Sequence, residues 1–289
     1  MNGHKLGVIG GSGLYDLDEL VDVERCQVDT PFGEPSGKYI CGNLGEQELV
    51  FLPRHGEGHT LLPSEVNYRA NIHGFRQLGV RHILSVSAVG SLREDVHPGE
   101  MVVPDQLFDR TRLRPNTFFG QGVVAHVSFG DPFCPQLRAT LLEVLRELNL
   151  SHHDGGTYVC MEGPCFSTRA ESEFYRSMGA SVIGMTNLPE AKLAREAEIC
   201  YATLALSTDY DCWHQSEEAV SVEAVLAVVR QNSAAARRVV AGLASRFRPQ
   251  AGCKCQSALA NAIMTDLGRI PMATRQRLAL LLESYLGDS

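Results

Sequence analysis

Residues 199–213 read ICYATLALSTDYDCW, an apolar run that ends abruptly in two carboxylates. The first eight residues have the length and composition of a strand buried on both faces of a sheet. Side chains two positions apart on an extended chain point to the same side, so we predict that Asp209 and Asp211 share one face where this strand ends. In isolation such a segment is more often a solvated loop, and the rest of the chain decides between the two interpretations.

The two carboxylates suggest a specific chemistry. Two carboxylates held close together and partly desolvated do not both ionise easily, so one keeps a proton near neutral pH. A protonated aspartate both donates and accepts a hydrogen bond. The edge of adenine formed by N7 and the 6-amino group offers one acceptor and one donor, which matches such a partner. We therefore expect Asp209 and Asp211 to form a catalytic pair that reads a purine.

Outward from this stretch, strand-like and helix-like segments alternate over the whole chain. Examples are predicted strands at 49–53 and 82–92 and predicted helices at 134–148 and 221–247. This alternation predicts an α/β fold, a three-layer α/β/α arrangement with a central mixed sheet covered on both faces. We divide the chain into a main domain, residues 1–250, and a C-terminal helical extension, residues 251–289, packed on the same domain.

The overall composition is that of an ordinary globular protein, with 289 residues, 44% hydrophobic and 21% charged. A net charge of -8 argues against nucleic acid or an anionic membrane as a partner. No apolar run approaches the length of a membrane span, and the N-terminus does not resemble a signal peptide, so we expect a cytoplasmic location. A local cluster of donors can still bind an anionic small molecule.

Three segments offer such donors. Gly10-Gly11-Ser12-Gly13 follows a short strand, and its spacing is not that of a dinucleotide loop, so a purely structural turn is an equal alternative. Arg54 and His55 follow the strand at 49–53, where a guanidinium can grip an oxyanion with two bonds, although a surface pair is the ordinary alternative. The strand at 82–92 ends in small polar residues and a glycine, a typical place for a ligand in an α/β sheet.

Nine cysteines are many for a cytosolic protein. Cys160 and Cys200 lie in apolar contexts and are interpreted as small core residues. Cys253 and Cys255 form a Cys-Lys-Cys sequence without a second pair or a histidine pair at zinc spacing, so we expect no metal site. We expect this pair to support the C-terminal tail, as thiols or as a disulfide, with two thiols of no consequence as the alternative.

Taken together, seven motifs resemble the S-methyl-5'-thioadenosine phosphorylase family of the purine nucleoside phosphorylase superfamily. They are Gly10-Gly11-Ser12-Gly13, Thr30-Pro31-Phe32-Gly33, Arg54-His55-Gly56, the segment 63–71, Gly90-Ser91-Leu92-Arg93-Glu94, Met185-Thr186 with Pro189-Glu190, and the segment 208–213. The resemblance runs from about residue 5 to about residue 245. It implies a phosphorylase-type α/β fold, a homotrimer or dimer of trimers, and a pentosyltransferase with inorganic phosphate as co-substrate and no metal or organic cofactor. The implied reaction is attack of phosphate on C1' of the nucleoside, which yields adenine and 5-methylthioribose 1-phosphate.

The resemblance also implies roles for individual residues. Phosphate would be bound by Ser12, Arg54, His55, Ser87, Ala88 through its backbone, and Thr186. The nucleoside would be bound by Phe166 and Ser167 at the purine, Met185 at the ribose, Val222 and Val225 at the methylthio group, and His126 reaching a neighbouring subunit. Asp209 and Asp211 would read N7 and the 6-amino group.

Two departures from the family pattern stand out. Cys165 replaces the arginine usual in Gly-Pro-Arg-Phe, which puts the support of that loop in doubt. The tail with Cys253 and Cys255 is longer than in the shorter trimeric relatives and is similar to that of members from thermophiles. Three alternatives stay open: a phosphorylase of 6-oxopurine nucleosides, which Asp209 disfavours, a nucleoside-binding protein without turnover, and a hydrolase on the same fold.

Overall fold

A single mixed sheet organises the computed structural model, which describes residues 5–11, 13–14, 17–214, 222–249 and 252–286. The side chains of residues 222–227 and 229–231 lie outside this description. The eleven described strands are β1 Lys5–Gly10, β2 Val21–Cys26, β3 Tyr39–Leu44, β4 Gln47–Pro53, β5 Val80–Ser91, β6 Met101–Val103, β7 Gln106–Arg110, β8 His152–Asp154, β9 Thr157–Met161, β10 Val182–Gly184 and β11 Cys200–Asp209. The helices of the described residues are α1 Tyr68–Gln77, α2 Pro135–Glu147, α3 Arg169–Ser177, α4 Asn187–Glu196, α5 Val222–Arg246, α6 Met272–Arg277 and α7 Ala279–Leu282, with short 3-10 turns η1 Lys254–Ser257 and η2 Leu267–Arg269.

The long strand β5 is the centre of the sheet. The order is β2-β3-β4-β1-β5-β10-β9-β7, and β11, β6 and β8 continue from β5. Strands β4, β1, β5 and β11 are parallel neighbours, so their carboxyl ends meet at one edge of the sheet. The last residues of β5 pair with the antiparallel strand β10. β10 therefore begins at the edge of the sheet where β5 ends.

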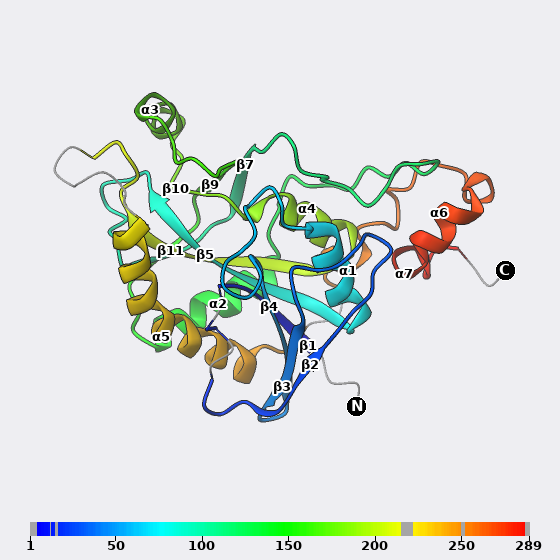
Figure 1. Ribbon diagram of the computed structural model, residues 1–289, viewed down its shortest axis with the longest axis horizontal. Coiled ribbons are helices and arrows are strands. Elements are labelled where there is room, and N and C mark those ends of the chain that lie inside the picture. Colours follow the sequence, from blue (N-terminus) through cyan, green and yellow to red (C-terminus); the bar gives the residue numbers. More distant parts are fainter. Residues whose placement is uncertain (1–4, 12, 15–16, 215–221, 250–251, 287–289) are drawn as a thin grey trace.

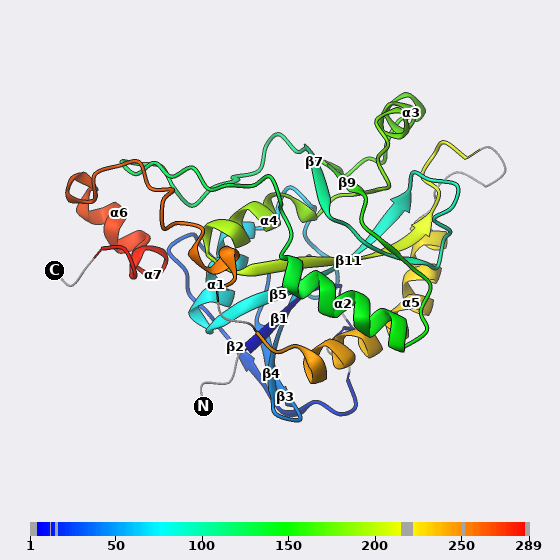
Figure 2. The same ribbon diagram turned by 180° about the vertical axis from the view of Figure 1, so that it is seen from behind.

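Both faces of the sheet are apolar, because alternate side chains of the central strands enter two different cores. On β11, Tyr201 and Ala205 belong to one core, whereas Ala202, Leu204 and Leu206 belong to the other. Helices α1 and α4 cover the first face and α2 and α5 the second (Figures 1 and 2). The predicted three-layer α/β/α fold is confirmed.

From Leu259 onward, the C-terminal part of the chain packs on the first face. Leu259, Leu278 and Leu282 are at most 1% exposed and join the core that contains α1 and α4. Helices α6 and α7 lie at the end of the molecule farthest from α3 (Figure 1). In the described part of the chain, no helix combines the length and apolar character needed to cross a membrane.

Candidate active site

The candidate site lies where parallel strands end. β4 ends at Pro53 and delivers Arg54, β5 carries Ser87 near its end, and β11 ends at Asp209. Because β10 runs antiparallel to β5, with Ile183 opposite Gly90, the chain after β10 brings Thr186 back towards the level of Ser87. The fold thus gathers predicted site residues from four segments that are far apart in sequence.

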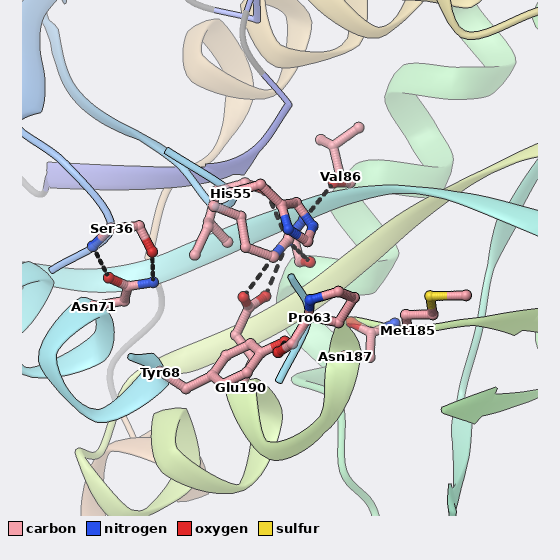
Figure 3. Close-up of polar contacts among 12 residues, drawn as sticks. Ser36, His55, Pro63, Tyr68, Asn71, Val86, Met185, Asn187 and Glu190 are labelled. Carbon is pink, nitrogen blue, oxygen red and sulfur yellow. Dashed lines mark hydrogen bonds and ion pairs between the residues drawn. The ribbon is translucent and has the colours of Figure 1, made fainter. Parts of the chain in front are cut away.

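Arg54 is the most deeply buried of these residues, with 2% of its surface exposed. Its Nε and Nη2 donate to the carboxylate of Glu190 on α4 at 2.8 and 3.1 Å, and Glu190 is fully buried (Figure 3). Nη1 donates to the carbonyl oxygen of Val86, and Nη2 also donates to Ser85 Oγ and the Ile9 carbonyl. Among the described residues, only one N–H of Nη1 has no protein acceptor. Arg54 therefore fixes β1, β5 and α4 together and has little hydrogen-bonding capacity left for a ligand.

Two hydroxyls beside this ion pair have no partner among the described residues. Ser87 Oγ and Thr186 Oγ1 are buried, each residue 7% exposed, and neither makes a hydrogen bond there. Both lie close to the Tyr158 hydroxyl, whose pKa burial raises to about 12 although these two hydroxyls act to lower it. Buried polar groups are normally hydrogen-bonded, and leaving one unpaired costs about 1–3 kcal/mol. Hydroxyl groups kept in this state mark a place that a polar ligand can fill.

His55 lies half-buried after Arg54 and is stacked on His59, with ring centroids 4.3 Å apart. Burial, with the charge of Arg54 adding to it, lowers the pKa of His55 to about 4. The ring is neutral at pH 7, and its Nδ1 lies 2.9 Å from the carbonyl oxygen of Leu61, which can only accept. The proton therefore sits on Nδ1, and Nε2 offers a lone pair. In this state His55 accepts a proton or hydrogen bond from a ligand hydroxyl and does not act as a cation.

The aspartate pair has a different geometry from the predicted one. β11 ends at Asp209, and Asp211 has a φ of +53°, so the two side chains are not on one extended strand. Asp209 instead accepts the backbone N–H of Asp211 at 2.8 Å through one oxygen and the hydroxyl of Thr208 at 2.7 Å through the other. Such a short-range aspartate turn is a common alternative to strand continuation.

The pKa of Asp211 is raised by its surroundings. Burial raises its pKa above the ordinary value, and the charge of Asp209 raises it further, while the hydroxyls of Ser172 and Ser167 act to lower it. Its Oδ2 is buried and has no hydrogen-bond partner among the described residues. Gly90 allows this approach, because a Cβ there would lie 2.9 Å from Asp209 Oδ1 and 3.3 Å from Asp211 Cβ. The two carboxyl groups are thus neighbours, held against the end of β5.

The loop between β9 and α3 carries Phe166, which is 47% exposed, and Ser167, whose carbonyl accepts from the Cys212 thiol at 3.3 Å. This contact ties the loop to the turn that follows β11. Met185 reaches the base of the same loop, since a Cβ on Gly163 would come within 2.6 Å of its sulfur. The structure therefore brings Phe166, Ser167 and Met185 to the aspartate side of the candidate site.

Sequence analysis missed two residues that hold the site. Arg114, nearly buried, donates to the Met185 carbonyl at 2.6 Å, to the Leu188 carbonyl at 2.7 Å and to the Glu162 carboxylate at 2.8 Å. It supplies support to the loop in which Cys165, exposed to solvent, replaces the usual arginine. The position of Arg114 in an irregular arginine-rich segment gave no indication of these partners. Glu190, the partner of Arg54, belonged to a recognised motif, but no role was predicted for it.

Other predicted site residues either make their contacts elsewhere or lie outside the described residues. The backbone N–H of His126 donates to the carbonyl oxygen of Ala262 in the C-terminal segment at 2.8 Å, and His126 lines a hollow with Lys192 and Glu196. Ala88 is exposed beside Ser87. Ser12 and the side chains of Val222 and Val225 lie outside the described residues. The two groups of described side chains with spacing suited to a metal ion both lie elsewhere.

Comparison with known proteins gives a consistent result. Residues 5–245 match the model of the phosphorylase superfamily. S-methyl-5'-thioadenosine phosphorylase of Geobacter sulfurreducens is 57% identical over 282 residues, which cover 97% of this chain and 99% of that protein. The protein of the same name from Thermosynechococcus vestitus is 54% identical, with 98% and 99% covered.

Solved structures agree. A crystal structure of methylthioadenosine phosphorylase sourced from an antarctic soil metagenomic library has a TM-score of 0.91 at 47% identity, and the match covers 98% of this chain and 100% of that one. Methylthioadenosine phosphorylase from Schistosoma mansoni, in complex with adenine, has a TM-score of 0.81 at 36% identity, with 97% and 98% covered. With this identity, coverage and shared fold, the chain belongs to the phosphorylase superfamily and, within it, to the S-methyl-5'-thioadenosine phosphorylase family.

Proposed function

We propose that the chain catalyses phosphorolysis of S-methyl-5'-thioadenosine to adenine and 5-methylthioribose 1-phosphate, a salvage reaction. The observation that carries this proposal is the pair of buried hydroxyls of Ser87 and Thr186, which have no partner in the part of the chain that the structure describes. They lie on the same sheet edge as two neighbouring carboxyl groups. One end of the site suits a small oxyanion and the other suits the polar edge of a purine.

In this mechanism phosphate binds at the end of the site formed by Ser87, Thr186 and Arg54. Ser87 and Thr186 donate their hydroxyl protons to its oxygens, as does Ser12, the backbone of Ala88 adds a further contact, and Arg54 contributes charge and its remaining N–H. Neutral His55 accepts the proton of a phosphate or ribose hydroxyl at Nε2. Bound phosphate then lies beneath C1', where its negative charge stabilises the positive charge that develops on the ribose.

The aspartate pair acts on the leaving group. The two carboxyl groups share one proton, which Asp211 holds more firmly than an exposed carboxyl group because it is buried next to Asp209. A proton or hydrogen bond given to N7 lets adenine depart neutral, and a positioned general acid of this kind contributes roughly 100- to 10,000-fold in rate. Phe166 and Met185 border the purine and ribose.

The decisive assay incubates the purified protein with S-methyl-5'-thioadenosine, with and without inorganic phosphate, and follows the release of adenine. We expect release that requires phosphate and equimolar formation of the sugar phosphate. Release without phosphate would identify a hydrolase, and tight binding without release a binding protein.

Purine choice is tested with Asp209→Asn. An amide can donate to O6 of a 6-oxopurine, so kcat/KM should fall for S-methyl-5'-thioadenosine and rise relative to it for methylthioinosine. The ratio of the two should move by tenfold or more, since an unpaired buried polar group costs about 1–3 kcal/mol. An unchanged ratio removes Asp209 from purine recognition.

We also propose that the active enzyme is a homotrimer or a dimer of trimers, located in the cytoplasm, in which His126 reaches the 5' pocket of a neighbouring subunit. Support comes from the segment 112–134, which runs along the molecule towards α6 and α7 (Figure 1). Phe118 of this segment does not contribute to such an interface, because it is buried in the core of its own chain against Phe32. Sedimentation at assay concentration tests the assembly, and a fully active monomer contradicts it.

A further inference from the structure

Four buried cysteines from three separate segments meet at the start of β11, the end of the strand opposite to Asp209. Cys134 is the N-cap of α2, Cys200 is the first residue of β11, and Cys253 and Cys255 lie at and within the turn η1. Their four sulfur atoms all lie within 4.8 Å of one another. The residues are 1%, 0%, 7% and 5% exposed, respectively.

The spacing of the sulfur atoms is that of a metal tetrathiolate. A zinc–sulfur bond of about 2.3 Å in a tetrahedron places sulfur atoms about 3.8 Å apart. Cys253 Sγ lies 3.7 Å from Cys134 Sγ and 3.5 Å from Cys200 Sγ. A disulfide needs a separation of about 2.05 Å, and all four cysteines are free in the structure. Cys253 has two sulfur neighbours at nearly equal distance. This arrangement suits a central ion bound by all the sulfur atoms better than a disulfide to one of them.

The surroundings favour thiolates with a soft cation. Cys134 stands at the N-terminus of a 13-residue helix, where the helix dipole stabilises a negative sulfur. The cluster is set in the apolar core formed by α2, α5 and β11, so water does not compete for the ion. Four sulfur ligands with no oxygen or nitrogen ligand are the donor set of tetrahedral zinc.

We propose that Cys134, Cys200, Cys253 and Cys255 bind one Zn²⁺ as a closed structural site that fastens the segment after α5 to α2 and β11. Binding replaces thiol protons, which leave to solvent, and involves no redox change. The site takes no part in the reaction, because its ligand on β11 lies at the opposite end of the strand from Asp209. The Cys-Lys-Cys spacing alone had argued against a metal site; the fold supplies the two missing ligands from residues more than fifty positions away.

The test measures the metal content of the intact protein, purified with a reductant and without a chelator. Elemental analysis should find one zinc per chain, and X-ray absorption should find four sulfur ligands at about 2.3 Å. Cys200→Ser/Cys253→Ser should lose the zinc. The control Cys26→Ser/Cys41→Ser, which removes another close thiol pair, 3.1 Å apart on β2 and β3, should keep it.

A thiol count on the denatured wild-type protein separates the alternatives without any variant. The zinc site predicts nine free thiols, the full number of cysteines, together with stoichiometric metal. Nine thiols without metal would mean that the cluster is only apolar packing, and a loss of four thiols would mean two disulfides. Either result overturns the proposal.

Stability gives a second readout. Removing zinc with a chelator should lower the thermal midpoint by roughly 8–16 °C while kcat at 25 °C stays unchanged. A chelated protein with the same midpoint contradicts a structural role for the ion.

Discussion

At the scale of single residues, Arg54 shows how a predicted ligand-binding group can also be part of the framework. Arg54 forms a buried ion pair with Glu190, in which each charge compensates the burial of the other. Removing one partner of such a pair typically costs 3–5 kcal/mol, because the other charge stays buried and unpaired. Substitution of Arg54 therefore tests folding as much as phosphate binding, and the neighbouring hydroxyls give the cleaner experiment.

Thr186→Val keeps the volume of the side chain and removes its hydroxyl. Because that hydroxyl has no protein partner among the described residues, the variant should fold normally and lose one hydrogen bond to a charged ligand. We expect the KM for phosphate to rise roughly 10- to 150-fold, with a much smaller change in the KM for nucleoside. Thr140→Val on α2 is the matched control. Equal changes in both KM values would place Thr186 outside the phosphate site.

Glu196 provides a pH-dependent test of stability. Burial raises its pKa from 4.5 to about 7, although it accepts hydrogen bonds from the Phe118 N–H and the Thr117 hydroxyl. Since the folded protein holds this proton more tightly than the unfolded chain, the stabilisation is present below pH 4.5 and is lost as the pH rises through 7.

The variant Glu196→Gln does not titrate at this position. The free energy of unfolding of the variant minus that of the wild type should therefore increase between pH 4.5 and 8, by about 1.4 kcal/mol per unit of pKa difference. Denaturant titrations at several pH values measure it. The exposed Glu143→Gln is the control for replacing a carboxylate by an amide. A flat profile for Glu196→Gln would show that Glu196 has an ordinary pKa.

At the scale of elements, the close contact between β5 and the end of β11 depends on Gly90. The backbone of Gly90 is compatible with alanine, but the added Cβ would lie 2.9 Å from Asp209 Oδ1. Gly90→Ala should therefore displace the carboxylate and lower kcat on S-methyl-5'-thioadenosine at least tenfold, with the KM for phosphate nearly unchanged. Gly130→Ala, where the Cβ meets open space, is the control. Full activity of Gly90→Ala would show that Asp209 tolerates displacement.

Elements with strong local signals were predictable. The apolar run at 199–206 is the body of β11, and the helices predicted at 134–148 and 221–247 are α2 and α5 within one or two residues. The helical character expected of the C-terminal extension is wrong for residues 258–267, because that segment forms turns and the start of the short η2, held by tertiary contacts. A weak amphipathic pattern in a short segment does not outweigh packing against a preformed core.

The candidate site was predictable in its residue types and less so in its geometry. Ser87 and Asp209 were predictable as site residues because they lie near the ends of predicted strands, where ligand sites of α/β sheets are found. The left-handed conformation of Asp211 was not predictable from an alternating pattern, since it depends on the hydrogen bond from its own N–H to Asp209. The side-chain partners of Arg54 and Arg114 come from positions more than thirty residues away, and no local pattern contains that information.

At the scale of the whole molecule, the division at residue 250 separates segments that share one core. A chain cut after residue 249 loses Leu259, Leu278 and Leu282, all fully or almost fully buried. Burying a leucine contributes about 1.5–3 kcal/mol, so the loss of three is comparable to the whole stability of a typical domain. We expect the shortened chain to be insoluble or to unfold far below the midpoint of the full chain by calorimetry. A soluble, equally stable product would show that residues 1–249 fold alone.

The meeting of Cys200 with Cys253 also has a consequence for the order of events during synthesis. The two residues are 53 positions apart, so translation at about 5–20 residues per second separates their appearance by roughly 3–10 s. In that interval the nascent chain already contains most of the catalytic framework but still lacks the segment that covers its core. Chaperone demand and sensitivity to oxidants should therefore peak late in elongation, shortly before the ribosome releases the chain.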